Sequence, residues 1–86
     1  MGYQVEFDKR TEKDLSKLDP QVAARIIEKC STLYKDPTSG PNISHLKLMP
    51  NLYRLRVGDY RVVYIVEGNR VIIKYIKHRK DIYTSL

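Results

Sequence analysis

Three arginines surround a short turn in the second half of the chain, and their spacing suits the binding of a phosphate group. Arg54 and Arg56 precede the pair Gly58-Asp59, and Arg61 follows it. A guanidinium group binds phosphate oxygens through paired hydrogen bonds and keeps its charge at physiological pH. Several guanidinium groups on one surface could therefore hold a phosphodiester and stabilise the charge that develops as it is cleaved.

The positive charge of the chain is concentrated in the same half. The formal net charge of the 86 residues is +6. Residues 1–44 carry equal numbers of basic and acidic side chains, so the whole excess falls in residues 45–86. This segregation indicates a binding surface, with phosphate as the expected ligand. The alternative is a solvated strand face whose arginine stems cover apolar side chains.

Other kinds of chemistry have little support in the sequence. Cys30 is the one cysteine, which excludes an intrachain disulfide and fits a reducing cytosol, and it is interpreted as a core residue. His45 is interpreted as a loop residue. No spaced set of histidines, cysteines or carboxylates suggests a metal site, and no cofactor is expected. No run approaches the roughly 20 apolar residues of a membrane-spanning helix, so no membrane contact is expected.

Hydrophobic periodicity predicts the elements that carry the arginines. Alternation over residues 3–7 predicts a first strand, and a charged segment over 9–18 predicts a first helix. Asp19-Pro20 supplies an N-cap and a first helical residue for a second helix of about 16 residues that ends before Pro37. Two-residue turns at 58–59 and 68–69, with glycine first as in type II′ turns, predict strands over 52–57, 60–67 and 70–77.

These elements predict a single α+β domain over residues 1–86. The N-terminal strand and a three-stranded antiparallel meander would form one sheet, with both helices packed on one face. The register of the first hairpin follows by counting from its turn. Arg56 then faces Arg61, and Arg54 faces Val63, on the side of the sheet away from the helices.

The same counting on the last strand adds further residues to the arginine side. Lys74 would face Val63 and join that side, together with His78 opposite Asp59. Strict alternation would send Arg79 toward the core unless the chain turns there. The segment from His78 to Tyr83 contains groups for proton transfer and charge stabilisation, or is simply a C-terminal cap that packs on the sheet.

These stretches together resemble RelE-type toxins of the RelE/ParE superfamily of toxin–antitoxin systems. The resemblance spans essentially the whole chain. Its most specific parts are Leu46-Lys47, Met49-Pro50, the run from Leu52 to Tyr64, and the segment 78–83. The order of a strand, two helices and an antiparallel meander is also similar to that of the family.

The resemblance implies an activity and its partners. RelE-type toxins cleave messenger RNA in the ribosomal A site without a metal. The ribose 2′-hydroxyl attacks the adjacent phosphate and leaves a 2′,3′-cyclic phosphate and a 5′-hydroxyl. The resemblance further implies a cytoplasmic protein that a cognate antitoxin neutralises and that reaches operator DNA only through the antitoxin complex.

The resemblance also assigns roles to individual positions. Arg61 would hold the scissile phosphate with Arg56 and Arg79 beside it, and Tyr83 would act on the 2′-hydroxyl or stack on a base. Phosphate contacts are expected from Arg54, Lys47 and Lys74, the last from the counted register. The best-described members carry lysines where this chain has Arg54 and Arg56. Since arginine is a poor proton donor, His78 becomes the candidate titrating group.

Two other functions fit the same fold and charge. A ParE-like toxin would bind DNA gyrase and would not depend on Tyr83. A non-catalytic RNA-binding module would bind RNA with strong salt dependence and produce no cut ends.

Overall fold

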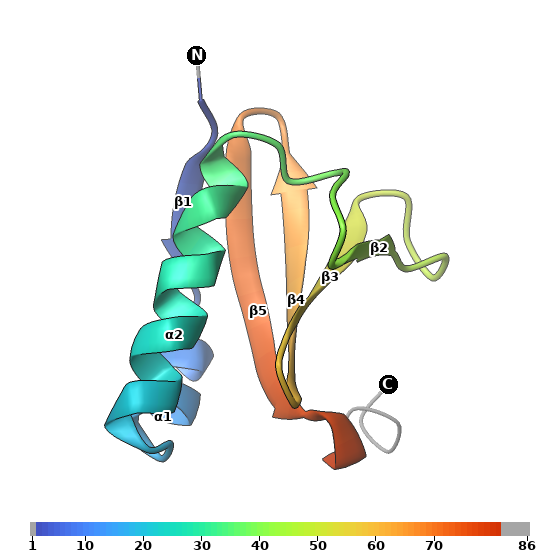
Figure 1. Ribbon diagram of the computed structural model, residues 1–86. Coiled ribbons are helices and arrows are strands. Elements are labelled where there is room, and N and C mark those ends of the chain that lie inside the picture. The colour runs from blue at the N-terminus through green and yellow to red at the C-terminus, as the bar shows by residue number, and fades with distance from the viewer. Residues whose placement is uncertain (1, 82–86) are drawn as a thin grey trace.

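The computed structural model describes residues 2–81 and contains one five-stranded sheet with two α-helices (Figure 1). In chain order the elements are β1 (Gln4–Phe7), α1 (Lys9–Ser16), α2 (Pro20–Ser31), a short 3₁₀ helix η1 (Thr32–Tyr34), β2 (Ile43–His45), β3 (Leu52–Val57), β4 (Tyr60–Glu67) and β5 (Arg70–His78). The strand order is β1-β5-β4-β3-β2. β1 runs parallel to β5, and the other neighbours are antiparallel.

The α+β class, the N-terminal strand and the meander of β3, β4 and β5 are confirmed, and the sheet contains one strand, β2, that was not predicted. β2 adds a short edge strand that pairs Ile43 with Leu55. A strand of three residues carries too little alternation to be recognised in a loop rich in proline and glycine. β1 lies at the opposite edge, where the helices form the crossover that a parallel pair needs.

Both helices begin after an aspartate N-cap, as the sequence predicts for the second one. The Oδ1 atom of Asp8 accepts a hydrogen bond from the backbone N–H of Arg10 at 3.0 Å, and that of Asp19 accepts one from Gln21 at 2.9 Å. α2 is shorter than predicted, because the chain tightens into η1 after Ser31. Cys30 is fully buried in the core, as predicted, and burial raises the pKa of its thiol to about 12.

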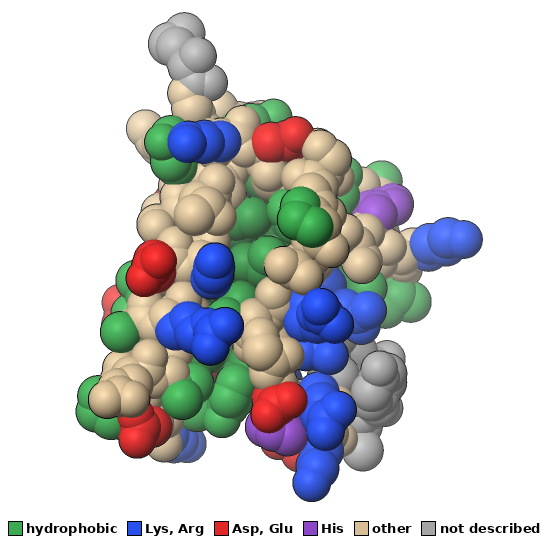
Figure 2. Space-filling model, in the orientation of Figure 1, with side chains coloured by type: hydrophobic (Ala, Val, Ile, Leu, Met, Phe, Trp, Pro, Cys, Tyr) green, Lys and Arg blue, Asp and Glu red, His purple; other side chains and the backbone are tan. Residues whose placement is uncertain are grey.

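The helices cover one side of the sheet but leave a groove beside β3. Figure 1 shows α2 running alongside β1 and β5, with β3 and β2 extending away from it. A hollow of about 580 Å³ lies between α2, the loop after η1 and β3. Figure 2 shows hydrophobic side chains on its floor and basic side chains at its rims. The floor includes Leu33 and Leu55, and the rims include Arg25, Lys29 and Lys35.

A buried hydrogen bond fixes the loop that forms one wall of this groove. Tyr64 is fully buried, and its hydroxyl donates to the carbonyl of Pro37 at 2.6 Å. Burial raises the pKa of Tyr64, so the phenol remains a neutral donor. Since a buried carbonyl without a partner is costly, this bond anchors the loop on the centre of the sheet.

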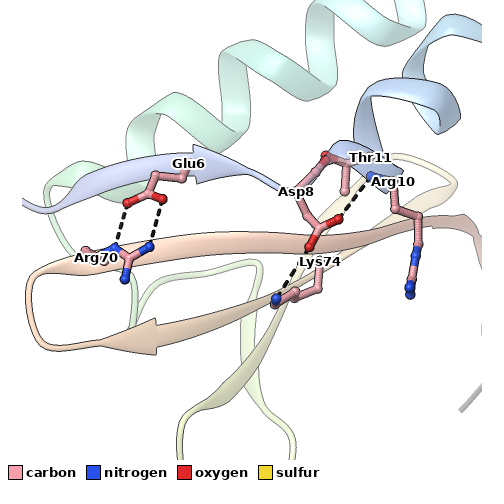
Figure 3. A network of polar contacts seen from close by, with 6 residues as sticks. All are labelled: Glu6, Asp8, Arg10, Thr11, Arg70 and Lys74. Atoms are coloured by element: carbon pink, nitrogen blue, oxygen red, sulfur yellow. Dashed lines mark hydrogen bonds and ion pairs between the residues drawn. The ribbon is translucent and has the colours of Figure 1, made fainter.

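A polar network ties β1 and the start of α1 to β5 (Figure 3). Glu6 accepts hydrogen bonds from Nε and Nη2 of Arg70 at 2.7 and 2.9 Å. Asp8 accepts a 3.4 Å bond from Nζ of Lys74. The pKa of Asp8 is lowered, first by the N–H of Arg10 and then by Lys74. These pairs join residues more than 60 positions apart in sequence.

The Glu6–Arg70 pair predicts an acid-dependent loss of stability. The hydrogen bond from Arg70 holds the pKa of Glu6 below its usual 4.5. A carboxyl whose pKa is lower in the folded state stabilises the fold above its unfolded pKa and loses that contribution as the pH falls through the folded value. We therefore expect Glu6→Gln to lower the urea midpoint at pH 7, and the difference from wild type to vanish well below pH 4.5.

Glu28→Gln is the matched control, because it removes an exposed carboxylate from α2 that forms no ion pair within residues 2–81. A pH-independent difference between Glu6→Gln and wild type would contradict the role of this pair.

Candidate phosphodiester-binding site

The first hairpin has the predicted turn and register. Gly58 adopts φ +58°, and no other residue type among residues 2–81 has a positive φ, which fits a type II′ turn with glycine in the first central position. Arg56 pairs with Arg61, and Arg54 pairs with Val63. The two predicted cross-strand neighbours are therefore confirmed, with their side chains on the face away from the helices.

The second hairpin departs from the predicted register halfway along β5. Pairing begins as counted, with Glu67 opposite Arg70 and Ile65 opposite Ile72. Tyr64 then faces Ile73 while Val63 faces Tyr75, so Lys74 has no partner in β4. This is a β-bulge, and it moves every later residue of β5 to the opposite face from the one counted.

The bulge corrects the predicted positions of Lys74 and His78. Lys74 does not face Val63, and its ammonium group is directed to Asp8 beside β1. His78 does not face Asp59 but pairs with Tyr60, and the two rings lie edge to face with centroids 5.3 Å apart. Tyr60 packs against the core beneath the helices, so His78 lies on the helix side of the sheet.

The same shift brings Lys77 to the arginine face, and β5 ends at the next residue, His78, where the chain turns. Lys77 pairs directly with Arg61, which itself pairs with Arg56. These three residues form a row across β3, β4 and β5, called here the cationic row. Arg79 follows two positions after Lys77 and lies beside the Gly58-Asp59 turn, where its N–H donates to the carbonyl of Asp59 at 2.7 Å.

Arg61, at the centre of the cationic row, is held in place by the turn that precedes it. Its Nη1 donates to the carbonyl oxygens of Gly58 at 3.0 Å and Tyr60 at 3.1 Å. Nε and Nη2 remain available as donors to an anion. A guanidinium group fixed before the substrate arrives needs little reorganisation to stabilise developing charge.

The neighbouring arginines have weaker supports. Nη2 of Arg56 lies 3.4 Å from Oδ1 of Asn42, and Nε of Arg79 lies 3.6 Å from Oδ1 of Asp59. Arg54 is half-buried and pairs with Ser44 of β2 as well as with Val63. Figure 2 shows a group of Lys and Arg side chains over β3 and the end of β5.

Part of the same face is apolar, which supports one element of the alternative interpretation. Leu52 and Val63 are buried there under Leu46, Ile65 and Tyr75. This small cluster lies toward the Leu52 end of β3, whereas the cationic row lies at the turn end. The basic side chains of the row are therefore not needed to cover it.

Three further predicted positions lie elsewhere. Lys47 is exposed in the loop between β2 and β3, at the opposite end of β3 from Arg61. His45 interacts with the carbonyls of Met49 and Pro50 at 3.2 and 3.0 Å and fixes that loop, as its interpretation as a loop residue predicts. Tyr83, and the predicted tail after Asp81, lie outside the described residues.

Sequence reasoning missed Lys77, Asp59 and Asn42. Lys77 is missed because apolar residues of β5 fall on both faces, so the sequence does not show that Ile76 rather than Tyr75 enters the core. Asp59 and Asn42 have no sequence signal, because each acts through a partner that only the fold brings near.

The grouping of cations on one face has the chemistry suited to an anion. Asp59 lies at the edge of this group of cations, beside Arg79. Residues 2–81 contain no group of three His, Cys, Asp or Glu side chains placed to hold a metal ion. No helix in the described part of the chain is long and apolar enough to cross a membrane.

Comparison with known proteins places this arrangement in a family. Residues 5–83 match the family described as ParE toxin of type II toxin-antitoxin system, parDE. The chain is 35% identical to toxin RelE3 of Methanocaldococcus jannaschii, over 92% of this chain and 93% of the relative. It is 30% identical to the mRNA interferase toxin RelE of Escherichia coli, over 99% and 94%.

The fold gives the same result. The toxin in the crystal structure of the archaeal RelE–RelB complex from Pyrococcus horikoshii superposes with a TM-score of 0.80 at 30% identity, over 92% of this chain and 97% of that chain. The isolated E. coli RelE toxin superposes with a TM-score of 0.75 at 26% identity, over 96% and 93%. The chain therefore belongs to the RelE/ParE family of type II toxin–antitoxin toxins.

Proposed function

We propose that this chain is a ribosome-dependent mRNA endonuclease that acts in the cytoplasm and is neutralised by a cognate antitoxin. The observation that carries the proposal is the cationic row, with Arg61 hydrogen-bonded in place between two other cations. The E. coli relative is named an mRNA interferase, and several structural relatives are toxin–antitoxin complexes. The proposed substrate, translated message, is found in the cytoplasm.

The proposed reaction proceeds by attack of the ribose 2′-hydroxyl on the adjacent phosphorus, without a metal. The O2′–P bond forms, the P–O5′ bond breaks, and the products are a 2′,3′-cyclic phosphate and a 5′-hydroxyl. Arg61 binds the non-bridging oxygens, and Arg56 and Arg79 share the added charge of the phosphorane. Arg54 and Lys47 contact flanking phosphates, and Tyr83 acts on the 2′-hydroxyl or stacks on a base.

The gyrase inhibitor is the rival function, because the matching family is named for ParE. The two functions differ in what they leave behind in the cell. An endonuclease gives new 5′-hydroxyl ends in translated messages, whereas a gyrase inhibitor gives DNA breaks that depend on topoisomerase. Mapping both kinds of ends after brief expression distinguishes them.

Arg61→Ala should nearly abolish the activity. Loss of one preorganised donor to a developing oxyanion costs about 10²–10³ in rate. We expect that loss in single-turnover cleavage of ribosome-bound message, and only partial recovery with Arg61→Lys, which keeps the charge but loses the paired hydrogen bonds. Arg25→Ala is the matched control, since it removes an exposed guanidinium group of α2 that forms no ion pair within residues 2–81. Equal losses in both variants would refute a specific role for Arg61.

Purified RNA should be a poor substrate. The cationic row can bind any phosphate, and the described residues offer few contacts to fix the sugar and base. The ribosome would supply that orientation, which lowers the barrier by fixing the reacting atoms. We expect clear cleavage of translated message and little or none of the same RNA alone. Similar single-turnover rates on the two substrates would show that the ribosome is not required.

The groove beside α2 is the proposed docking site for the antitoxin. Its apolar floor and basic rims fit an amphipathic helix with acidic flanks. Residues that line it include Arg56, a member of the cationic row, and Asn42 and Gly58, which contact Arg56 and Arg61. An antitoxin helix in the groove would therefore contact Asn42 and Gly58, the residues that hold Arg56 and Arg61.

Charge reversal in the groove should weaken antitoxin binding. We expect the double substitution Arg25→Glu and Lys29→Glu to reduce affinity for the cognate antitoxin by more than about tenfold in calorimetric titration, since it opposes acidic groups at the contact. The control is Lys9→Glu with Lys13→Glu on α1, which changes the net charge equally. Equal weakening in both doubles would indicate general electrostatic steering. Unchanged affinity in the groove double would place docking on the arginine face instead.

A further inference from the structure

The cationic row contains one side chain that differs chemically from its neighbours. Arg56 and Arg61 are guanidinium groups, whereas Lys77, opposite Arg61 on β5, is an ammonium group. Neighbouring strands lie about 4.8 Å apart, so one phosphodiester bound at Arg61 is within reach of both flanking residues. Nothing in the sequence motif or in the counted register assigns a role to Lys77.

The surroundings of Lys77 leave its ammonium group free to meet a substrate. The side chain is half-buried, and the residue directly opposite is itself basic. Within residues 2–81, Lys77 forms no ion pair, in contrast to Lys74, which is bound to Asp8. Its same-face neighbour along β5 is the aromatic residue Tyr75, which offers no acidic partner.

The proposed reaction requires a proton that the arginines do not supply. When the P–O5′ bond breaks, the leaving oxygen takes the electron pair and must be protonated. A guanidinium group does not release a proton in proteins, whereas an ammonium group can. His78, the candidate proton donor that the sequence offered in place of lysine, lies on the helix side of the sheet against Tyr60.

We propose that Lys77 is a catalytic residue that donates the proton to the 5′ oxygen, which extends the proposed endonuclease function to a named acid. The O2′–P bond forms as the 2′-hydroxyl loses its proton to solvent water. The P–O5′ bond breaks, O5′ receives a proton from Nζ of Lys77, and the resulting amine regains one from water. The bulge at Lys74 is what brings Lys77 beside Arg61 for this step.

A substrate with a sulfur leaving atom tests the assignment directly. The message is prepared with sulfur in place of O5′ at the scissile linkage mapped for the wild-type toxin, and it is loaded in the ribosomal A site. A thiolate leaves without protonation, so loss of the acid no longer matters. On the oxygen substrate we expect Lys77→Met and Lys77→Arg to slow single-turnover cleavage by about 10²–10⁴-fold, as for loss of a general acid.

On the sulfur substrate, Lys77→Arg should recover nearly the wild-type rate, because it keeps the charge and lacks only the transferable proton. Arg61→Ala should remain slow on both substrates, since the charge of the phosphorane is unchanged. Lys13→Ala, an exposed lysine of α1, is the charge-matched control and should be unaffected on either substrate. Near-native circular dichroism of Lys77→Arg verifies that this conservative variant is folded.

The outcomes separate this inference from the function on which it rests. If the wild-type toxin cleaves both substrates and Lys77→Arg is slowed equally on both, Lys77 is not the acid and only contacts the phosphate. If the wild-type toxin cleaves and Lys77→Arg is not slowed on the oxygen substrate, the role of Lys77 as the acid is also overturned. If Lys80→Ala shows the sulfur rescue instead, the donor is Lys80. A wild-type protein that cleaves neither substrate refutes the endonuclease function itself.

Discussion

The site depends on a single residue of β5, Lys74, that has no partner in β4. Side chains alternate strictly between the two faces of a strand, so one unpaired residue reverses the orientation of everything that follows. Without it, Ile76 would lie on the arginine face and Lys77 would be directed into the core. With it, Ile76 is buried and Lys77 meets Arg61. The apolar core thus determines the composition of the cationic row.

The like charges in this row disfavour folding, and the surrounding structure offsets that cost. Like charges directly opposite each other on adjacent strands are destabilising. Carbonyl oxygens of the turn accept hydrogen bonds from Arg61, Asp59 lies beside Arg79, and Asn42 lies beside Arg56. Bound phosphate would remove the remaining repulsion. A site of this kind is less stable empty than filled, as expected where binding rather than folding selects the residues.

The sequence predicted the parts of the fold that depend on local chemistry. The turn at Gly58 determines which residues of β3 and β4 face each other, so the Arg56–Arg61 pair followed from counting. The bulge did not follow, because Tyr75 could have filled a core position as readily as Ile76. In the folded chain the unpaired residue, Lys74, contacts Asp8, which lies 66 positions away in the sequence. The N-terminal strand itself was predicted, but its parallel pairing with β5 joins residues far apart in the sequence and did not follow from the local pattern.

In the proposed function, RNA binds one face of the sheet and the antitoxin binds the other. Both binding sites contact the same turn, which contains Gly58. Arg61 on one face is held by the carbonyl of Gly58, and Gly58 also lines the groove on the other face. The turn is short and its glycine has a positive φ, so its geometry has little freedom to adjust independently on the two sides. A ligand in the groove that displaces this turn must therefore also displace Arg61. Such a connection would allow an antitoxin to inactivate the site without imitating RNA.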